Sequence, residues 1–174
     1  SGMAAGRPVA ARATGTIDAT RNRQASSRGV RRVLVKLGMA ELIDPTPSRN
    51  RNLVCAMLAA TVIAPDSKLA TARALRAETA TSSLGAVLGV AGCDEDDLYA
   101  AMDWLLARKD AIENALAARH LANGTLVLYD VSSAAFEGRH CPLGASGYAR
   151  DGVHGRRQIV HGLLCTTPGA PLAV

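Results

Sequence analysis

The stretch TLVLYDVSS, residues 125–133, decides the fold, because four apolar or aromatic residues run directly into one carboxylate. The turn-forming pair Asn123-Gly124 precedes it. A short apolar run with β-branched and aromatic members predicts a buried strand over residues 125–131, with Asp130 near its end in a hydrophobic sheet. Burying an ionised carboxylate is costly unless a partner such as a metal ion compensates it. The alternative is that Asp130 caps the strand or starts a turn.

The composition indicates a folded chain with a basic balance. Its 174 residues suit one domain, or one small domain plus part of another. The hydrophobic fraction is 48% but the aromatic fraction is 3%, so Ala, Leu and Val must form the core, which favours helices. The net charge of +5 is compatible with nucleic-acid binding. No stretch approaches about 18 consecutive apolar residues, so no membrane span is expected.

The four cysteines, Cys55, Cys93, Cys141 and Cys165, are scattered and form no C-x-x-C pair. This spacing indicates neither a disulfide framework nor a zinc module, and a reducing cytoplasmic location fits best. The pair His140-Cys141 with His154 matches no standard zinc spacing. Isolated cysteines are expected to be small buried hydrophobic residues.

Residues 1–28 are predicted to be a disordered basic arm, with five arginines against one acid, Asp18. The arm either contacts DNA phosphates or is a solvated tail. Residues 29–121 are predicted to be helical, as a DNA-binding or dimerisation region. Caps or breaks delimit its helices, which are expected at Gly29–Ile43, from Ser48 to the end at Pro65, from Asp66-Ser67 to Arg76, at Ser83–Leu88, and from the acid run Asp94–Asp97 through Leu121. The acid run is interpreted as a helix cap that complements the helix dipole, and not as a metal loop.

After Asn123-Gly124 the pattern changes from helical to extended, so the predicted fold class is α+β. Residues 134–157 are predicted to be a long glycine-rich connection, of the kind that often carries function. A second strand is expected at Gln158–Cys165 and a third from Pro171. The chain ends at Val174 inside an apolar run, which predicts a truncated sheet whose unpaired edge promotes self-association.

The segment LYDVSSAAFEGRHCPLGASGYARDGVHGRRQIVHGLL, residues 128–164, resembles the beginning of the catalytic domain of bacterial DDE-type insertion-sequence transposases. Residues 63–75 and 94–121 resemble the helical region of that family, and the resemblance covers about residues 29–174. It implies an RNase H-like fold in which Asp, Asp and Glu hold two divalent ions. Asp130 matches the first of these acids, so residues 122–174 are the expected start of the catalytic domain.

The resemblance implies that two Mg²⁺ or Mn²⁺ ions, held by carboxylates, clamp the attacking and leaving oxygens of a phosphodiester. The family's second Asp and its Glu match no residue of this chain, and Glu137 and Asp151 belong to loop motifs. The chain is therefore expected to bind metal weakly and to cut DNA poorly or not at all. His161 stands where the family often has an aromatic residue, and it is interpreted as a packing variant.

The expected function is DNA transposition, in a truncated form with DNA and further copies of the chain as partners. Four basic residues that border the Asp130 strand either contact DNA phosphates or serve loop solubility: Arg139, Arg150, Arg156 and Arg157. One alternative is a non-catalytic DNA-binding or dimerising remnant that inhibits a full-length transposase. Another is an RNase H-like nuclease without strand transfer.

Overall fold

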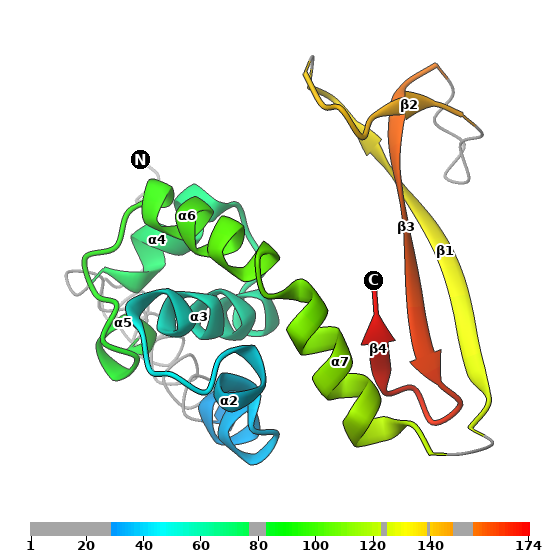
Figure 1. Cartoon of the computed structure of the whole chain (residues 1–174). Helices are drawn as coiled ribbons and strands as arrows, with labels where there is room; N and C mark the ends of the chain where they lie inside the picture. Colours follow the sequence, from blue (N-terminus) through cyan, green and yellow to red (C-terminus); the bar gives the residue numbers. More distant parts are fainter. Residues whose placement is uncertain (1–28, 77–82, 123–124, 139, 148–154) are drawn as a thin grey trace, which may run out of the picture. The chain divides into compact units, whose positions relative to one another are not determined.

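A computed structural model describes residues 29–76, 83–122, 125–138, 140–147 and 155–174 (Figure 1). The predicted basic arm, residues 1–28, lies outside the described residues. The chain divides into a helical unit that ends at Lys109 and a second unit, Asp110–Val174, which contains an antiparallel sheet. The mixed helical and antiparallel architecture confirms the α+β class. The region predicted as helical, 29–121, includes α7 (Lys109–His120), which the division places mostly with the sheet.

The helical unit contains a helix over residues 29–36 followed by five further helices: α2 (Met39–Ile43), α3 (Arg49–Ile63), α4 (Lys68–Leu75), α5 (Leu84–Val87) and α6 (Glu95–Leu106). The single helix predicted over Gly29–Ile43 is wrong, because Gly38 interrupts it with φ 63°. That left-handed backbone is strained for residues with a Cβ, so a glycine here ends one helix and begins the next.

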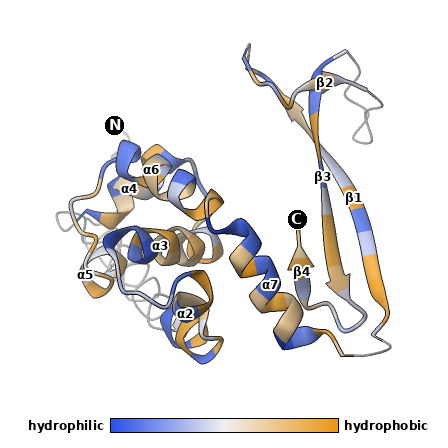
Figure 2. Cartoon of the chain, viewed as in Figure 1, coloured by the Kyte–Doolittle hydropathy of each residue, from blue (hydrophilic) through white to orange (hydrophobic). Residues whose placement is uncertain are grey.

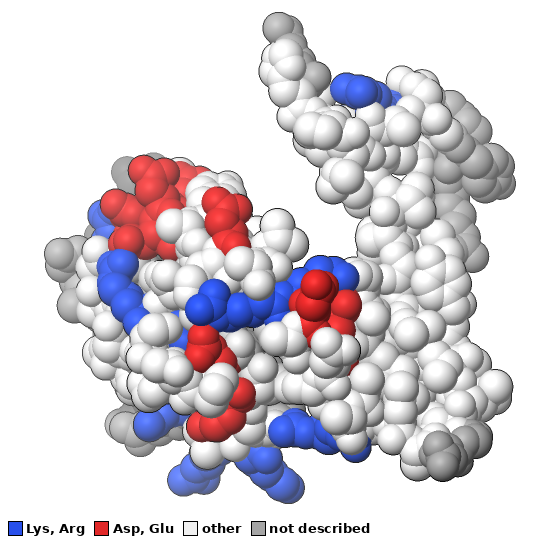
Figure 3. Space-filling view, viewed as in Figure 1, with Lys and Arg blue, Asp and Glu red and all other residues white. Residues whose placement is uncertain are grey.

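The predicted caps of α3, α4 and α6 are confirmed. Ser48 Oγ accepts a hydrogen bond from the Arg51 N–H at 3.2 Å, and Ser67 caps α4 in the same way. Asp94 and Asp97 form a reciprocal capping box at the start of α6. Figure 3 shows acidic side chains gathered over α6. These side chains satisfy the first backbone N–H groups of each helix, which explains why the helices begin at these residues.

A second contact engages the acid run at the start of α6. Asp97 accepts hydrogen bonds from both terminal nitrogens of Arg49, at 2.6 and 2.8 Å, and these hydrogen bonds are the main cause that lowers the pKa of Asp97 to about 2. The run therefore joins α6 to α3, and its interpretation as a helix cap is confirmed.

The core of the helical unit lies between α3 and α6, where Leu53 and Leu98 are fully buried. Figure 2 shows hydrophobic residues along α3. Cys55 and Cys93 are buried in this core, as predicted, and burial raises the pKa of both thiols. Protonated thiols in an apolar setting are poor nucleophiles, so these cysteines serve packing.

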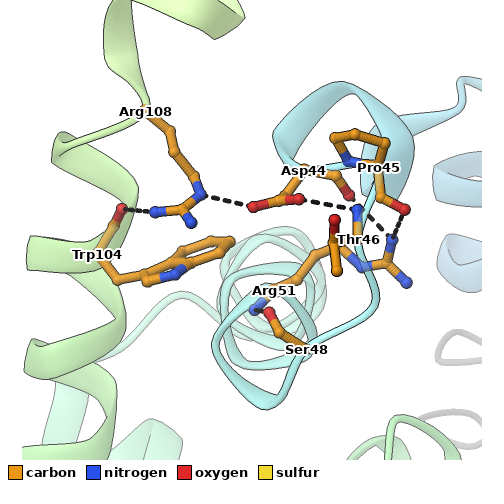
Figure 4. Close-up of polar contacts among 7 residues, drawn as sticks. All are labelled: Asp44, Pro45, Thr46, Ser48, Arg51, Trp104 and Arg108. Atoms are coloured by element: carbon orange, nitrogen blue, oxygen red, sulfur yellow. Dashed lines mark hydrogen bonds and ion pairs between the residues drawn. The ribbon is translucent and has the colours of Figure 1, made fainter.

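A polar cluster around Arg108 joins the end of α6 to the segment after α2 (Figure 4). Arg108 Nε donates to Asp44 Oδ2 at 2.7 Å, and Arg108 Nη1 donates to the Trp104 carbonyl at 3.0 Å. The guanidinium carbon lies 3.7 Å from the centroid of the Trp104 ring. The hydrogen bond from Arg108 is the main cause that lowers the pKa of Asp44. One side chain thus provides an ion pair, a main-chain hydrogen bond and a cation–π contact.

The sheet contains β1 (Val127–Phe136), β2 (Ala145–Ser146), β3 (Arg157–Thr166) and β4 (Pro171–Ala173). Strand β3 is central: β1 pairs with it antiparallel along its whole length, from Val127↔Thr166 to Phe136↔Arg157. Strands β2 and β4 pair with opposite ends of the other edge of β3. The predicted second strand and the predicted third strand from Pro171 are confirmed within a residue.

The prediction of a short, buried first strand over residues 125–131 is wrong in two respects. Strand β1 continues to Phe136, because β3 offers it ten consecutive partners. It is also largely exposed, with Leu128 46% and Tyr129 69% accessible. An apolar run indicates a strand but does not show whether another layer covers it. A helix that packs on a sheet as a second layer buries side chains against it. In the described part of the second unit, α7 has no buried side chain.

Among the described helices, none is by itself long and apolar enough to cross a bilayer; α3 and α4 meet that criterion together, across a 104° bend.

Candidate functional site

Asp130 lies within β1, as the fourth of its ten residues, opposite Leu163 of β3. It is exposed to solvent. The sequence predicted either a carboxylate near the end of a buried strand or a strand cap. Both predictions are wrong, because Asp130 is exposed and lies inside the strand. Because the β1 ladder continues for six residues beyond it, Asp130 projects from the middle of a hairpin face.

The register determines which side chains share the face of Asp130. Alternate pairs of an antiparallel ladder point the same way, so Ser132 and its partner His161 lie on this face. His161 is diagonal to Asp130, at a position within reach of long side chains. His161 is exposed, which contradicts its interpretation as a packing residue. Sequence reasoning missed this neighbour because the pairing register brings the two residues together across 31 positions of sequence.

The opposite face of the hairpin is braced by an aromatic side chain. The Tyr129 ring covers Gly162 so closely that a Cβ at Gly162 would collide with the Tyr129 hydroxyl and ring. A glycine inside a strand often marks such a close approach. Gly162, a glycine inside the strand, was the signal in the sequence for this contact. It keeps β1 and β3 close together next to Asp130.

The predicted DNA-contacting arginines are only partly described. Arg139 and Arg150 lie outside the described residues. Arg157, opposite Phe136, shares the face of Asp130 but stands six residues farther along the hairpin, which corresponds to roughly 20 Å. Arg156 forms an ion pair with Glu137, and both side chains are largely exposed. The structure therefore does not place Arg157 next to Asp130.

The loop motif after β1 is organised by Phe136. The Phe136 ring lies against Gly138, where a Cβ would collide with it, and it also lies near Gly144. At Gly138 the ring occupies the space that a side chain would need, whereas at Gly144 a Cβ would make an ordinary contact with it. Gln158 is buried at the same end of β3, and its Oε1 has no hydrogen-bond partner among the described atoms. The motif residues Phe136 and Gly138 thus have a packing role.

The donor set around Asp130 does not fit a complete two-metal centre. Two ions need several carboxylate oxygens, and this face presents one carboxylate with a hydroxyl and an imidazole nearby. Across the residues that the structure describes, no group of three or more His, Cys, Asp or Glu side chains could hold a metal ion. The described residues around Asp130 therefore supply too few carboxylate oxygens to hold two ions.

Comparisons of the chain with protein-family models, curated proteins and solved structures found no match.

Proposed function

We propose that the chain is part of a DDE-type DNA transposase with an RNase H-like catalytic domain, and that Asp130 is the first of its three metal-binding carboxylates. The observation that carries the proposal is the position of Asp130, an exposed carboxylate on the face of a long hairpin within the motif that resembles this family. The hairpin of β1 and β3, followed by the short β4, also fits the beginning of the sheet that the resemblance implies.

The proposed reaction is cleavage of the ends of an insertion sequence and their transfer to target DNA. Mg²⁺ or Mn²⁺ are the proposed cofactors, because carboxylate oxygens prefer such hard cations. Asp130 alone does not fill the coordination shells of two ions, so activity requires a second Asp and a Glu that these residues do not supply. The work proposed for this chain is to present the first carboxylate and to hold DNA.

The two described arginines would contact DNA in different ways. Arg157 shares the face of Asp130 about 20 Å away, so one DNA backbone lying along the hairpin would meet both positions. Arg156 would first have to leave its ion pair with Glu137, which costs little because exposed pairs are weak. Such phosphate contacts position DNA without reading its sequence. A cytoplasmic location and homo-oligomerisation belong to the same proposal.

The second candidate function is that of a non-catalytic partner that dimerises with a full-length transposase and inhibits it. One observation favours it. An apolar groove of about 620 Å³ lies between the helix at 29–36 and the end of α3, and its lining includes exposed Val33 and Val62. Apolar grooves of this kind are typical of protein contacts.

Metal-dependent nicking of plasmid DNA that carries the element ends tests the first candidate. The assay uses the natural full-length protein, with Asp130→Asn compared against Asp103→Asn, which changes an exposed aspartate of α6 in the same way. We expect Asp130→Asn to abolish nicking and to leave DNA binding within about two-fold, because the variant keeps the shape of the side chain and loses its charge. Nicking by Asp130→Asn at the rate of Asp103→Asn would refute the assignment.

A further inference from the structure

The helical unit contains a second feature, a cleft of about 550 Å³ between the helix at 29–36 and the start of α5. One wall is basic and the other largely apolar. Figure 3 shows Lys and Arg side chains projecting from the end of this unit that carries residues 29–36. The residues that line the cleft are Arg31, Arg32, Val35, Lys36, Ser83, Leu84 and Val87.

The three cations of the cleft differ from the two arginines that join helices of the same unit. Arg49 and Arg108 are held in ion pairs with Asp97 and Asp44. Arg31, Arg32 and Lys36 have no hydrogen-bond or ion-pair partner within the described part of the chain, and the described residues that line the cleft include no carboxylate. Arg32 and Lys36 stand one helical turn apart, where like charges repel and destabilise the helix. The cleft thus concentrates positive charge that the described residues do not neutralise.

The shape and lining of the cleft suit a chain of phosphates. Residues 31 to 36 span about 7.5 Å along the helix axis, which matches two to three successive phosphates at about 3.4 Å of axial rise per strand. Guanidinium groups donate paired hydrogen bonds to phosphate oxygens, and Ser83 adds a hydroxyl donor. Leu84 and the half-exposed Val87 form a wall of low dielectric constant, which strengthens the attraction of an anion to the opposite side.

We propose that this cleft binds the sugar–phosphate backbone of DNA, with Arg31, Arg32 and Lys36 neutralising two to three phosphates. The identity of the polyanion rests on the proposed function of the chain. The cleft is formed within the helical unit, and its contacts hold DNA independently of its sequence. An acidic protein segment is the competing ligand, but it presents fewer charges per length than the phosphate backbone.

The salt dependence of DNA binding tests the proposal. Fluorescence anisotropy of a labelled random-sequence duplex is measured between about 50 and 200 mM salt, with the whole chain and with the variant Arg31→Gln/Arg32→Gln/Lys36→Gln. Each lost phosphate contact lowers the slope of log K against log[salt] by about 0.9, so we expect the slope to fall by about 2 to 3. Affinity at the lower salt concentration should fall roughly ten-fold or more.

A matched control removes the same charge elsewhere. The variant Lys68→Gln/Lys109→Gln/Arg119→Gln changes three cations outside the cleft, and its slope should change by less than about 1. Circular dichroism verifies that both triple variants keep their helices. Equal losses in the two variants would mean that net charge alone binds DNA, and an unchanged slope in the cleft variant would likewise refute the proposal. Displacement of the duplex by polyglutamate as readily as by unlabelled duplex would assign the cleft to acidic proteins.

The salt slope and the nicking assay together separate this proposal from the assignment of Asp130. Asp130→Asn should keep the wild-type salt slope, because Asp130 holds no phosphate in the proposed cleft. A cleft variant with normal slope together with inactive Asp130→Asn would refute the cleft alone. A cleft variant with reduced slope together with fully active Asp130→Asn would refute the catalytic assignment alone.

Discussion

The helical unit contains a core of buried apolar side chains, whereas within the described part of the sheet unit Leu172 is the one apolar side chain that is buried. Leu53 and Leu98 have no exposed area, while Leu128 and Tyr129 are 46% and 69% exposed. Capping side chains and ion pairs also stabilise the helix ends of the helical unit. The difference indicates that the first unit has a hydrophobic core of its own, whereas the second presents a face on which the carboxylate of Asp130 is exposed.

The largest expected effect concerns the buried core of the helical unit. Leu53→Ala removes a fully buried side chain of α3 and should destabilise the helical unit by about 2–5 kcal/mol, because a cavity remains. Leu128→Ala in the exposed strand should cost less than about 1 kcal/mol. Urea unfolding followed by the fluorescence of Trp104, the sole tryptophan, reports on the helical unit, and hydrogen exchange of the β1 amides reports on the sheet unit. Similar losses in both variants would remove the contrast between the units.

The next effect concerns the cluster around Arg108. Arg108→Ala removes the ion pair with Asp44, the hydrogen bond to the Trp104 carbonyl and the cation–π contact, and should cost about 1–3 kcal/mol. Arg32→Ala is the matched control, because Arg32 has no partner within the described residues, and it should change the free energy of unfolding by less than about 0.5 kcal/mol. Equal values measured by urea unfolding would mean that the cluster is an ordinary surface contact.

Acid should weaken the helical unit in a defined pH range. The pKa of Asp97 is lowered to about 2 by Arg49, and that of Asp44 is lowered chiefly by Arg108. A lowered folded-state pKa contributes stability above the unfolded value of about 3.9, and this stability is lost as pH falls through the folded value. Unfolding followed by Trp104 fluorescence should therefore become easier between about pH 4 and pH 2. In Asp97→Asn this pH dependence should be shallower, and an unchanged profile would contradict the role of the Arg49 pair.

The smallest expected effect concerns the hairpin. Gly162→Ala forces the Tyr129 ring to move, and this should destabilise the strand pair by about 1 kcal/mol. Gly147→Ala is the control, because a Cβ there meets no atom within 4 Å among the described residues. Hydrogen exchange of the β1 and β3 amides should accelerate in the first variant and not in the second. Unchanged exchange in Gly162→Ala would mean that Tyr129 does not brace the hairpin.

Local signals in the sequence predicted most of the helical unit. Ser48, Ser67 and the run from Asp94 to Asp97 stand where helices start, because a side chain must satisfy the first N–H groups of each helix. The break at Gly38 was not predicted, because the apolar pattern continues through it while the backbone adopts φ 63°. A glycine inside a segment of helical periodicity is compatible both with a continuous helix and with a break between two helices.

The sheet and its candidate site were less predictable, because they depend on partners far away in the sequence. The β1 strand reaches Phe136 because β3 pairs with it there, and the exposure of Leu128 depends on which layers cover the sheet. The resemblance identified Asp130, but His161 enters its surroundings through the register alone. Register follows from how two strands meet, and one strand's composition does not encode it.

The most direct test of the central claim, that the face of Asp130 binds divalent ions, is paramagnetic line broadening by Mn²⁺ in amide spectra of this chain. Broadening detects weak binding, which one carboxylate would provide. We expect the amides around Asp130 and His161 to broaden first, and the effect to disappear in Asp130→Asn. Broadening confined to the acid run at the start of α6, or unchanged around Asp130 in that variant, would contradict the account.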